Sequence, residues 1–149
     1  MNLLELEVNE AKTRANAKKI LKRYRGMKRM LSHYLIDSHA ALSSKRLSDM
    51  PINHSNQNIV EAQMIKKLDG VEKHFVWKKE IECIEEALEY MDDRGREAIE
   101  RTYLVKDEKT QSYIALEMGY SLRGLENLLQ RSLLEFAETY KGGEIVVWK

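Results

Sequence analysis

Residues 111–130 read QSYIALEMGYSLRGLENLLQ. Ala115 places a small side chain where two helices that cross at a steep angle must approach closely, and Gly119 can adopt the positive φ of a tight turn between them. Ser121 is a good N-cap for the second helix. The apolar residues that this arrangement would bury are Ile114, Met118, Leu125 and Leu128. The spacing therefore predicts two helices joined by a tight turn.

Such a pair of helices either binds DNA or is an ordinary helical hairpin, and the motif alone leaves both interpretations open. In a DNA-binding pair, the second helix enters the major groove and its N-terminal half faces the base edges. Arg can then bond to guanine, Asn and Gln to adenine, and Glu can accept from cytosine. We predict a helix-turn-helix at about residues 111–131, with these outward base-reading candidates: Arg123, Glu126, Asn127, Gln130 and Arg131.

Gly124 lies one turn into this second helix, where glycine costs about 1 kcal/mol relative to Ala. It allows either a close approach to DNA or the avoidance of a clash within the fold. Further phosphate contacts are expected from Thr110 and Gln111 at the start of the first helix, and from Ser121.

The composition of the 149 residues predicts a nearly all-α protein. The chain has one proline and seven glycines, and Leu, Glu, Lys, Arg and Ala are frequent. A single cysteine, Cys83, excludes an internal disulfide, and the four histidines lack the spacing of metal ligands, so we expect neither a metal site nor a cofactor. The clearest helical pattern is an apolar seam of alternating three- and four-residue spacings: His74, Trp77, Ile81, Ile84, Leu88 and Met91.

The N-terminal region is predicted to form a long amphipathic helix from about Leu4 to Leu35. Residues 1–36 hold nine basic and three acidic side chains, a formal charge of +6 that leaves −5 for the other 113 residues. This asymmetry suggests an anionic partner for the basic part, although a solvated basic face is the open alternative. On the DNA interpretation, the phosphate-contacting candidates of this helix are Lys18, Lys22, Arg25 and Arg29.

The chain is accordingly divided into a basic helix (1–36), a polar linker (37–58) and a helical DNA-binding domain (59–149). Pro51 and the surrounding polar residues indicate the linker. Within the third region, Asp69-Gly70 suggests a stop or kink, and Asp92-Asp93 a cap for a helix from about Arg94 to Leu104. The apolar residues 145–148 are expected to pack back as a short strand or an irregular tail, with no assigned function.

Seven acidic residues between Glu80 and Asp93 would repel DNA. We expect them to face away from the duplex, where they form a candidate contact for a basic surface of host RNA polymerase. A solvated acidic face is the simpler alternative.

Two resemblances extend this interpretation. The run Ile84-x-x-Ala87-Leu88-x-x-Met91-x-x-x-x-Arg96-x-x-Ile99-x-x-x-Tyr103, followed by Thr110-x-x-x-Ile114-Ala115-x-x-x-Gly119-Tyr120-Ser121, resembles DNA-binding region four of bacterial sigma factors. The chain from about residue 15 to 140 resembles the ArpU family of phage late-gene transcriptional regulators, through residues 21–28, 48–51 and 133–140. The resemblance implies a sequence-specific activator of a late operon in phages or prophages of Gram-positive bacteria. The recognition helix departs from the pattern at residues 122–125, which leaves the target sequence open.

Other classes of function fit less well. No phosphate-binding loop, catalytic triad signature or metal cluster suggests an enzyme, and no apolar run is long enough to span a membrane. We therefore expect a cytoplasmic protein of a bacterial host cell that binds double-stranded promoter DNA. The competing hypothesis is a helical interaction or phage assembly factor without DNA binding, self-associating through the seam from Trp77 to Met91. Homodimer and monomer both remain open.

Overall fold

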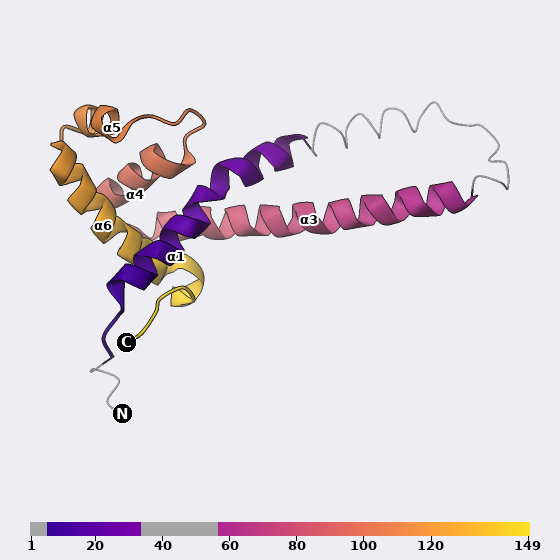
Figure 1. The fold of residues 1–149 in the computed structure, drawn as a ribbon, viewed down its shortest axis with the longest axis horizontal. Helices are drawn as coiled ribbons and strands as arrows, with labels where there is room; N and C mark the ends of the chain where they lie inside the picture. Colours follow the sequence, from indigo (N-terminus) through magenta and orange to yellow (C-terminus); the bar gives the residue numbers. More distant parts are fainter. Residues whose placement is uncertain (1–5, 34–56) are drawn as a thin grey trace. The chain divides into compact units, whose positions relative to one another are not determined.

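The computed structural model describes residues 6–33 and 57–149, and it confirms the all-α prediction (Figure 1). Every regular element in those ranges is a helix, and the extended pairing in them is limited to one isolated bridge between Val8 and Trp148. The elements are α1 (Glu10–Lys22), α3 (Gln57–Glu89), α4 (Asp93–Ile99), the π-helical η3 (Glu100–Leu104), α5 (Gln111–Met118), α6 (Leu122–Thr139) and the 3₁₀-helical η4 (Tyr140–Gly143).

The chain divides into two compact units, one made of Met1–Gly26 with Ile81–Lys149 and the other of Met27–Glu80. In the first unit α6 is the central helix, and α1, α4 and α5 all pack on it. Its buried side chains include Leu125, Leu133 and Phe136, each at most 2% exposed. Burying each of them contributes about 1.5–3 kcal/mol to folding.

The C-terminal part of the predicted apolar seam, from Ile81 to Met91, belongs to this core, whereas His74 and Trp77 lie in the second unit and are partly exposed. Ile81, Ile84, Leu88 and Met91 are each buried within the first unit. The C-terminal part of the seam is therefore occupied by the chain's own packing, so it is not an exposed surface for self-association.

The N-terminal helix has different bounds from those expected. Asn9 is the N-cap, since its side chain accepts from the Lys12 amide, and α1 begins at Glu10. A turn at Arg23 interrupts the helical backbone, which resumes over residues 24–33. The expected ends at Leu4 and Leu35 lie outside the described residues, as does most of the expected linker; its last two residues, 57 and 58, begin α3.

Two other boundaries also differ. Helix α3 runs through Asp69-Gly70, so these residues do not end it. The helix expected from about Arg94 to Leu104 is α4 from Asp93, continued by one π-helical segment. Asp92 occupies the N-cap position without a side-chain capping bond; its backbone N–H instead donates to Oε1 of Glu135 at 2.7 Å. The start of α4 is thus anchored to α6.

The apolar C-terminal tail packs back on the start of the chain. The backbone N–H of Asn9 donates to the Val147 carbonyl at 2.7 Å, and the backbone N–H of Lys149 donates to the Glu7 carbonyl at 2.8 Å. The turn that directs the tail there uses Gly142 and Gly143, both at positive φ. None of the helices in the described ranges is long and apolar enough to cross a membrane.

Candidate nucleic-acid interface

Helices α5 and α6 are joined by the tight turn that the sequence predicts. Thr110 caps α5 by accepting from the Tyr113 amide, and Gly119 ends it in the left-handed region at φ 75°. The amide of Tyr120 donates back to the Ala115 carbonyl at 2.8 Å, which satisfies one of the last carbonyls of α5. Ser121 then caps α6, accepting from the Gly124 amide at 3.0 Å. Two residues, Tyr120 and Ser121, separate the C-cap glycine from α6.

The two helices bury three of the four apolar residues expected between them, Ile114, Leu125 and Leu128, whereas Met118 is only partly buried. Ile114 and Ala115 of α5 and Leu125 of α6 are each at most 2% exposed. Gly124 has an explanation within the fold, because a β-carbon there would lie 3.1 Å from the capping hydroxyl of Ser121 and 3.5 Å from the Tyr120 ring. A side chain at this position would crowd the cap that starts α6.

All five base-reading candidates are exposed and share the face of α6 opposite its core. Their spacings of three and four residues keep them on one side of the helix. Within the part of the chain that the structure describes, their side chains make no hydrogen bond or ion pair. Their side chains are thus available to a ligand. These residues are Arg123, Glu126, Asn127, Gln130 and Arg131.

The residues expected to contact phosphates differ in their exposure and in their contacts within the fold. Lys18 and Lys22 are exposed on α1, Gln111 is exposed on α5, and the hydroxyls of Thr110 and Ser121 serve as caps. Arg25 has a structural use: its guanidinium donates to the carbonyls of Val105 at 2.6 Å and Thr102 at 2.9 Å. These contacts satisfy carbonyls at the end of η3. Arg29 is exposed and belongs to the second unit.

Sequence reasoning missed the residues that support the turn. Nη1 of Arg94 on α4 donates to the Tyr120 hydroxyl at 2.8 Å, and the guanidinium lies 5.5 Å from the centroid of that ring. Arg101 of η3 pairs with Glu97 at 3.0 Å and with Glu117 of α5. Arg101 and Glu97 are four residues apart on the helix, but the contacts of Arg94 with Tyr120 and of Arg101 with Glu117 join residues 26 and 16 positions apart, so no local pattern indicates them.

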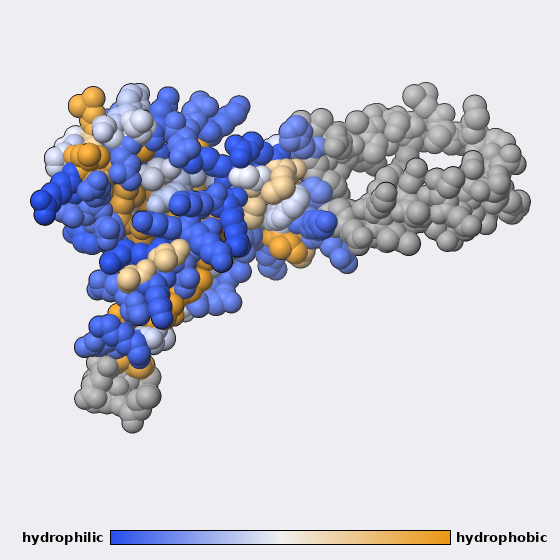
Figure 2. Space-filling model, in the orientation of Figure 1, coloured by the Kyte–Doolittle hydropathy of each residue, from blue (hydrophilic) through white to orange (hydrophobic). Residues whose placement is uncertain are grey.

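The surface near this motif is mostly hydrophilic in the view of Figure 2, with small hydrophobic patches at the end where α5 lies. Leu116 is 78% exposed, Leu122 45% and Tyr113 44%. Exposed leucines beside polar side chains are compatible with apolar contacts such as those to thymine methyl groups.

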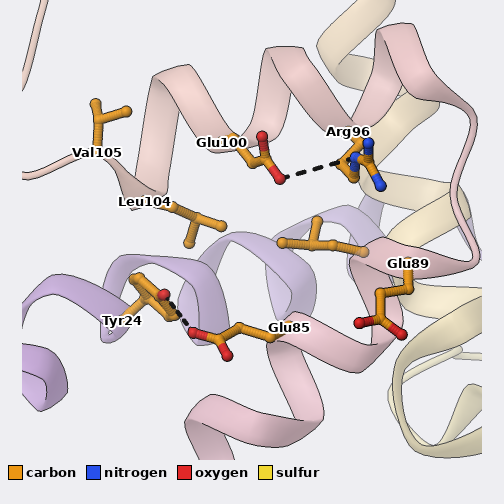
Figure 3. Close-up of a pocket in the computed structure, with 8 residues that line it drawn as sticks. Tyr24, Glu85, Glu89, Arg96, Glu100, Leu104 and Val105 are labelled. Carbon is orange, nitrogen blue, oxygen red and sulfur yellow. Dashed lines mark hydrogen bonds and ion pairs between the residues drawn. The ribbon is translucent and has the colours of Figure 1, made fainter.

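The first unit also contains a pocket lined mainly by acidic side chains. The pocket of about 440 Å³ in Figure 3 has a wall from α3, with Glu85 and Glu89, and a wall from α4 and η3, with Glu100. The hydroxyl of Tyr24 donates to Oε1 of Glu85 at 2.7 Å, while Arg96 lies 3.8 Å from Glu100. Burial, and then this hydrogen bond, raise the pKa of Tyr24 well above its ordinary value.

Comparison with known proteins gives two curated relatives. The chain is 32% identical over 149 residues, the full length of both, to a protein of Enterococcus hirae named "Putative autolysin regulatory protein ArpU". It is 30% identical over 144 residues to a protein of Streptococcus phage O1205 with the same name, covering 95% of this chain and 96% of that one. No family model matches the chain, and no solved structure matches it.

Proposed function

Because the chain belongs to the ArpU family, whose curated members are named as regulatory proteins, we propose that it is a sequence-specific double-stranded DNA-binding transcription regulator. The single observation that carries this proposal is the exposed face of α6. Five polar side chains follow the capped turn there, and they have no partner among the residues that the structure describes. The order of α4, α5 and α6 fits the expected likeness to sigma region four, which is part of the proposal. Activation of a phage or prophage late operon is the further expectation that the resemblance adds.

The proposed DNA contacts are of two kinds, contacts to base edges and contacts to phosphates. Arg123, Asn127 and Gln130 occupy the turns of α6 that a recognition helix presents to base edges. Glu126 between them repels phosphates, so it favours selective over non-specific binding. The caps at Thr110 and Ser121 leave backbone N–H groups at the starts of α5 and α6, which are suited to phosphate oxygens. Lys18 and Lys22 supply sequence-independent attraction.

Footprinting of the region upstream of the neighbouring late operon, with purified protein at several salt concentrations, tests the proposal. A protected site is expected, with affinity that falls steeply with salt. The double variant Arg123→Glu with Arg131→Glu should abolish protection while leaving the circular dichroism spectrum unchanged, because both side chains are exposed. The absence of protection at any salt concentration would rule out specific binding to that region.

A matched variant separates base reading from charge. Arg123→Lys keeps the positive charge but loses the two-pronged donor geometry that guanine recognition uses. It should lower affinity for the protected site by roughly tenfold or more while leaving affinity for scrambled DNA nearly unchanged. Equal losses on both DNAs would assign Arg123 to the phosphate backbone.

The acidic stretch from Glu80 to Asp93 is the proposed contact for a basic surface of host RNA polymerase. Glu86→Ala with Glu89→Ala tests this and spares the bond between Tyr24 and Glu85. DNA affinity should stay the same while transcription from the regulated promoter falls; unchanged transcription would favour the simpler role of a solvated face.

A further inference from the structure

A polar pocket of about 340 Å³ lies within the first unit, between the start of α4 and one flank of α6. Arg94 lines it from α4, Arg131 lines it from α6, and Tyr120 lines it from the turn that precedes α6. The pocket thus brings together two arginines that are far apart in the sequence. Its other lining residues are Asp92, Gly95, Leu128, Ser132 and Glu135.

Tyr120 holds Arg94 in place without neutralising it. Nη1 of Arg94 donates to the Tyr120 hydroxyl at 2.8 Å, and the guanidinium lies 5.5 Å from the centroid of that ring. A guanidinium has five N–H donors, and this contact uses one of them. Among the described residues, neither Arg94 nor Arg131 forms an ion pair with an acidic side chain. Arg94 therefore keeps most of its donors and its full positive charge for a ligand.

The two acidic residues of the pocket meet each other at the start of α4. Oε1 of Glu135 accepts from the backbone N–H of Asp92 at 2.7 Å. With two arginines and two acidic residues, the pocket has no net formal charge. A free anion gains little from a neutral pocket, whereas a phosphate that belongs to a bound duplex is brought to the arginines by the other contacts of that duplex. The pocket chemistry therefore favours a phosphate of DNA over a free anion.

Arg131 lies where the pocket meets the exposed face of α6. At 100° per residue, it is about 80° around the helix from Arg123, whereas Leu128 and Glu135 are about 140° and 120° around. When a recognition helix lies in the major groove, its central stripe faces the bases and its flanks face the phosphates that border the groove. The pocket is on such a flank.

We propose that Arg94 and Arg131 together hold one phosphate of the DNA backbone beside the major groove, and that Tyr120 positions Arg94 for this contact. The inference rests on the proposed function and deepens it in two respects. It adds Arg94, which precedes the predicted helix-turn-helix, and it moves Arg131 from base reading to the backbone. Two guanidinium groups that line one pocket repel each other, and a phosphate between them offsets this repulsion and accepts charge-assisted hydrogen bonds from both.

The salt dependence of binding tests the phosphate contact, with the protected duplex and a scrambled duplex as probes. Arg94→Ala and Arg131→Ala should each weaken binding to both duplexes by a similar factor, roughly three- to tenfold. Each should also lower the slope of log affinity against log salt concentration by about one. A loss confined to the protected duplex in Arg131→Ala would return Arg131 to base reading and overturn the shared phosphate.

Arg96→Ala is the matched control for charge. Arg96 is two residues from Arg94, about 200° around α4, and it lies 3.9 Å from Asp93 and 3.8 Å from Glu100. The variant removes the same charge from the same helix, but from a side chain that faces acidic partners instead of the pocket. It should leave the salt slope unchanged. An equal fall of the slope in Arg96→Ala and Arg94→Ala would assign the effect to overall charge and overturn the contact.

Duplexes in which single phosphates are replaced by uncharged methylphosphonates locate the contact. One replacement at an edge of the protected site should weaken binding of wild type severalfold and leave the affinities of Arg94→Ala and Arg131→Ala unchanged, because these variants have already lost half of the contact. If wild type binds DNA but no such position exists, the shared phosphate is overturned and the proposed function stands. Wild type that binds no DNA would overturn both.

Tyr120→Phe tests the positioning role, since it removes the hydroxyl and keeps the ring. Alone it should weaken DNA binding less than Arg94→Ala does. Added to Arg94→Ala it should cause no further loss, because the hydroxyl acts through Arg94. A merely structural role would lower affinity in both backgrounds, so a further loss in the double variant would overturn the positioning role of Tyr120.

Discussion

A β-carbon at Gly95 would lie 2.8 Å from Oγ of Ser132, which shows how closely α4 approaches α6. Ser132 has little freedom to move away, since it is 1% exposed and its hydroxyl donates to the Leu128 carbonyl at 2.6 Å. Gly95→Ala should therefore destabilise the protein by about 1–3 kcal/mol through overpacking, despite the better helix propensity of Ala. Urea unfolding measures the change.

Two variants control for this explanation. Gly95→Ala with Ser132→Ala should recover part of the loss, because the crowding atom is gone. Gly26→Ala, where a β-carbon would meet nothing within 4 Å, should be neutral or slightly stabilising. Destabilisation of similar size at both glycines would point to a backbone effect instead of the contact with Ser132.

The turn between α5 and α6 depends on the backbone of Gly119. At φ 75° a residue with a side chain is strained, although a β-carbon there would meet no other atom within 4 Å. Gly119→Ala should cost about 1–2 kcal/mol of unfolding free energy, and Gly119→Asn less, because Asn tolerates this region better. Thermal unfolding of the two variants side by side checks the order, and an Asn variant less stable than the Ala variant would contradict it.

The tail is held by a buried hydroxyl. The Val147 amide donates to Oγ1 of Thr13, which is 1% exposed on α1, at 3.0 Å. Thr13→Val should cost about 1–3 kcal/mol because it leaves this amide without its partner. Amide hydrogen exchange at Val147 should accelerate in the variant. Thr13→Ser, which keeps the acceptor, should protect the amide better than Thr13→Val; equal exchange in both would show that the hydroxyl does not hold the tail.

The raised pKa of Tyr24 predicts a loss of stability at alkaline pH. Its ordinary value is 10.0. The folded state holds the Tyr24 proton more tightly than the unfolded state does. The stabilisation that Tyr24 adds to the free energy of unfolding is therefore complete below pH 10 and is lost as the pH rises above it, because the unfolded tyrosine ionises first. In Tyr24→Phe the fall in unfolding free energy between about pH 9 and 11 should be shallower. Tyr90→Phe, at a side chain 73% exposed, should behave like wild type.

The sequence was informative where structure depends on neighbours along the chain. Thr110 and Ser121 cap their helices, Gly119 takes positive φ, and Ile114, Leu125 and Leu128 are buried as expected, because caps, turns and helical periodicity are encoded within a few residues. Met118, which was also expected to be buried, is partly exposed. The same local reasoning identified the exposed face of α6. Its assignment to base reading stays a prediction.

Local reasoning did not fix helix ends that depend on distant partners. Asp69-Gly70 has the composition of a stop, yet α3 passes through it, and the capping role expected at Asp92 is replaced by a bond from its amide to Glu135.

By itself, the sequence determined the helical class, the capped turn at Gly119 and the separation of charge along the chain, since each arises from residue type and spacing. The tertiary structure alone decided that Arg25 would bind the carbonyls at the end of η3, that Arg94 would support Tyr120, and that residues 145–149 would join the start of the chain. Those pairings unite residues far apart in the sequence. They form because folding brings a donor and an acceptor together and removes both from water, which no local pattern records.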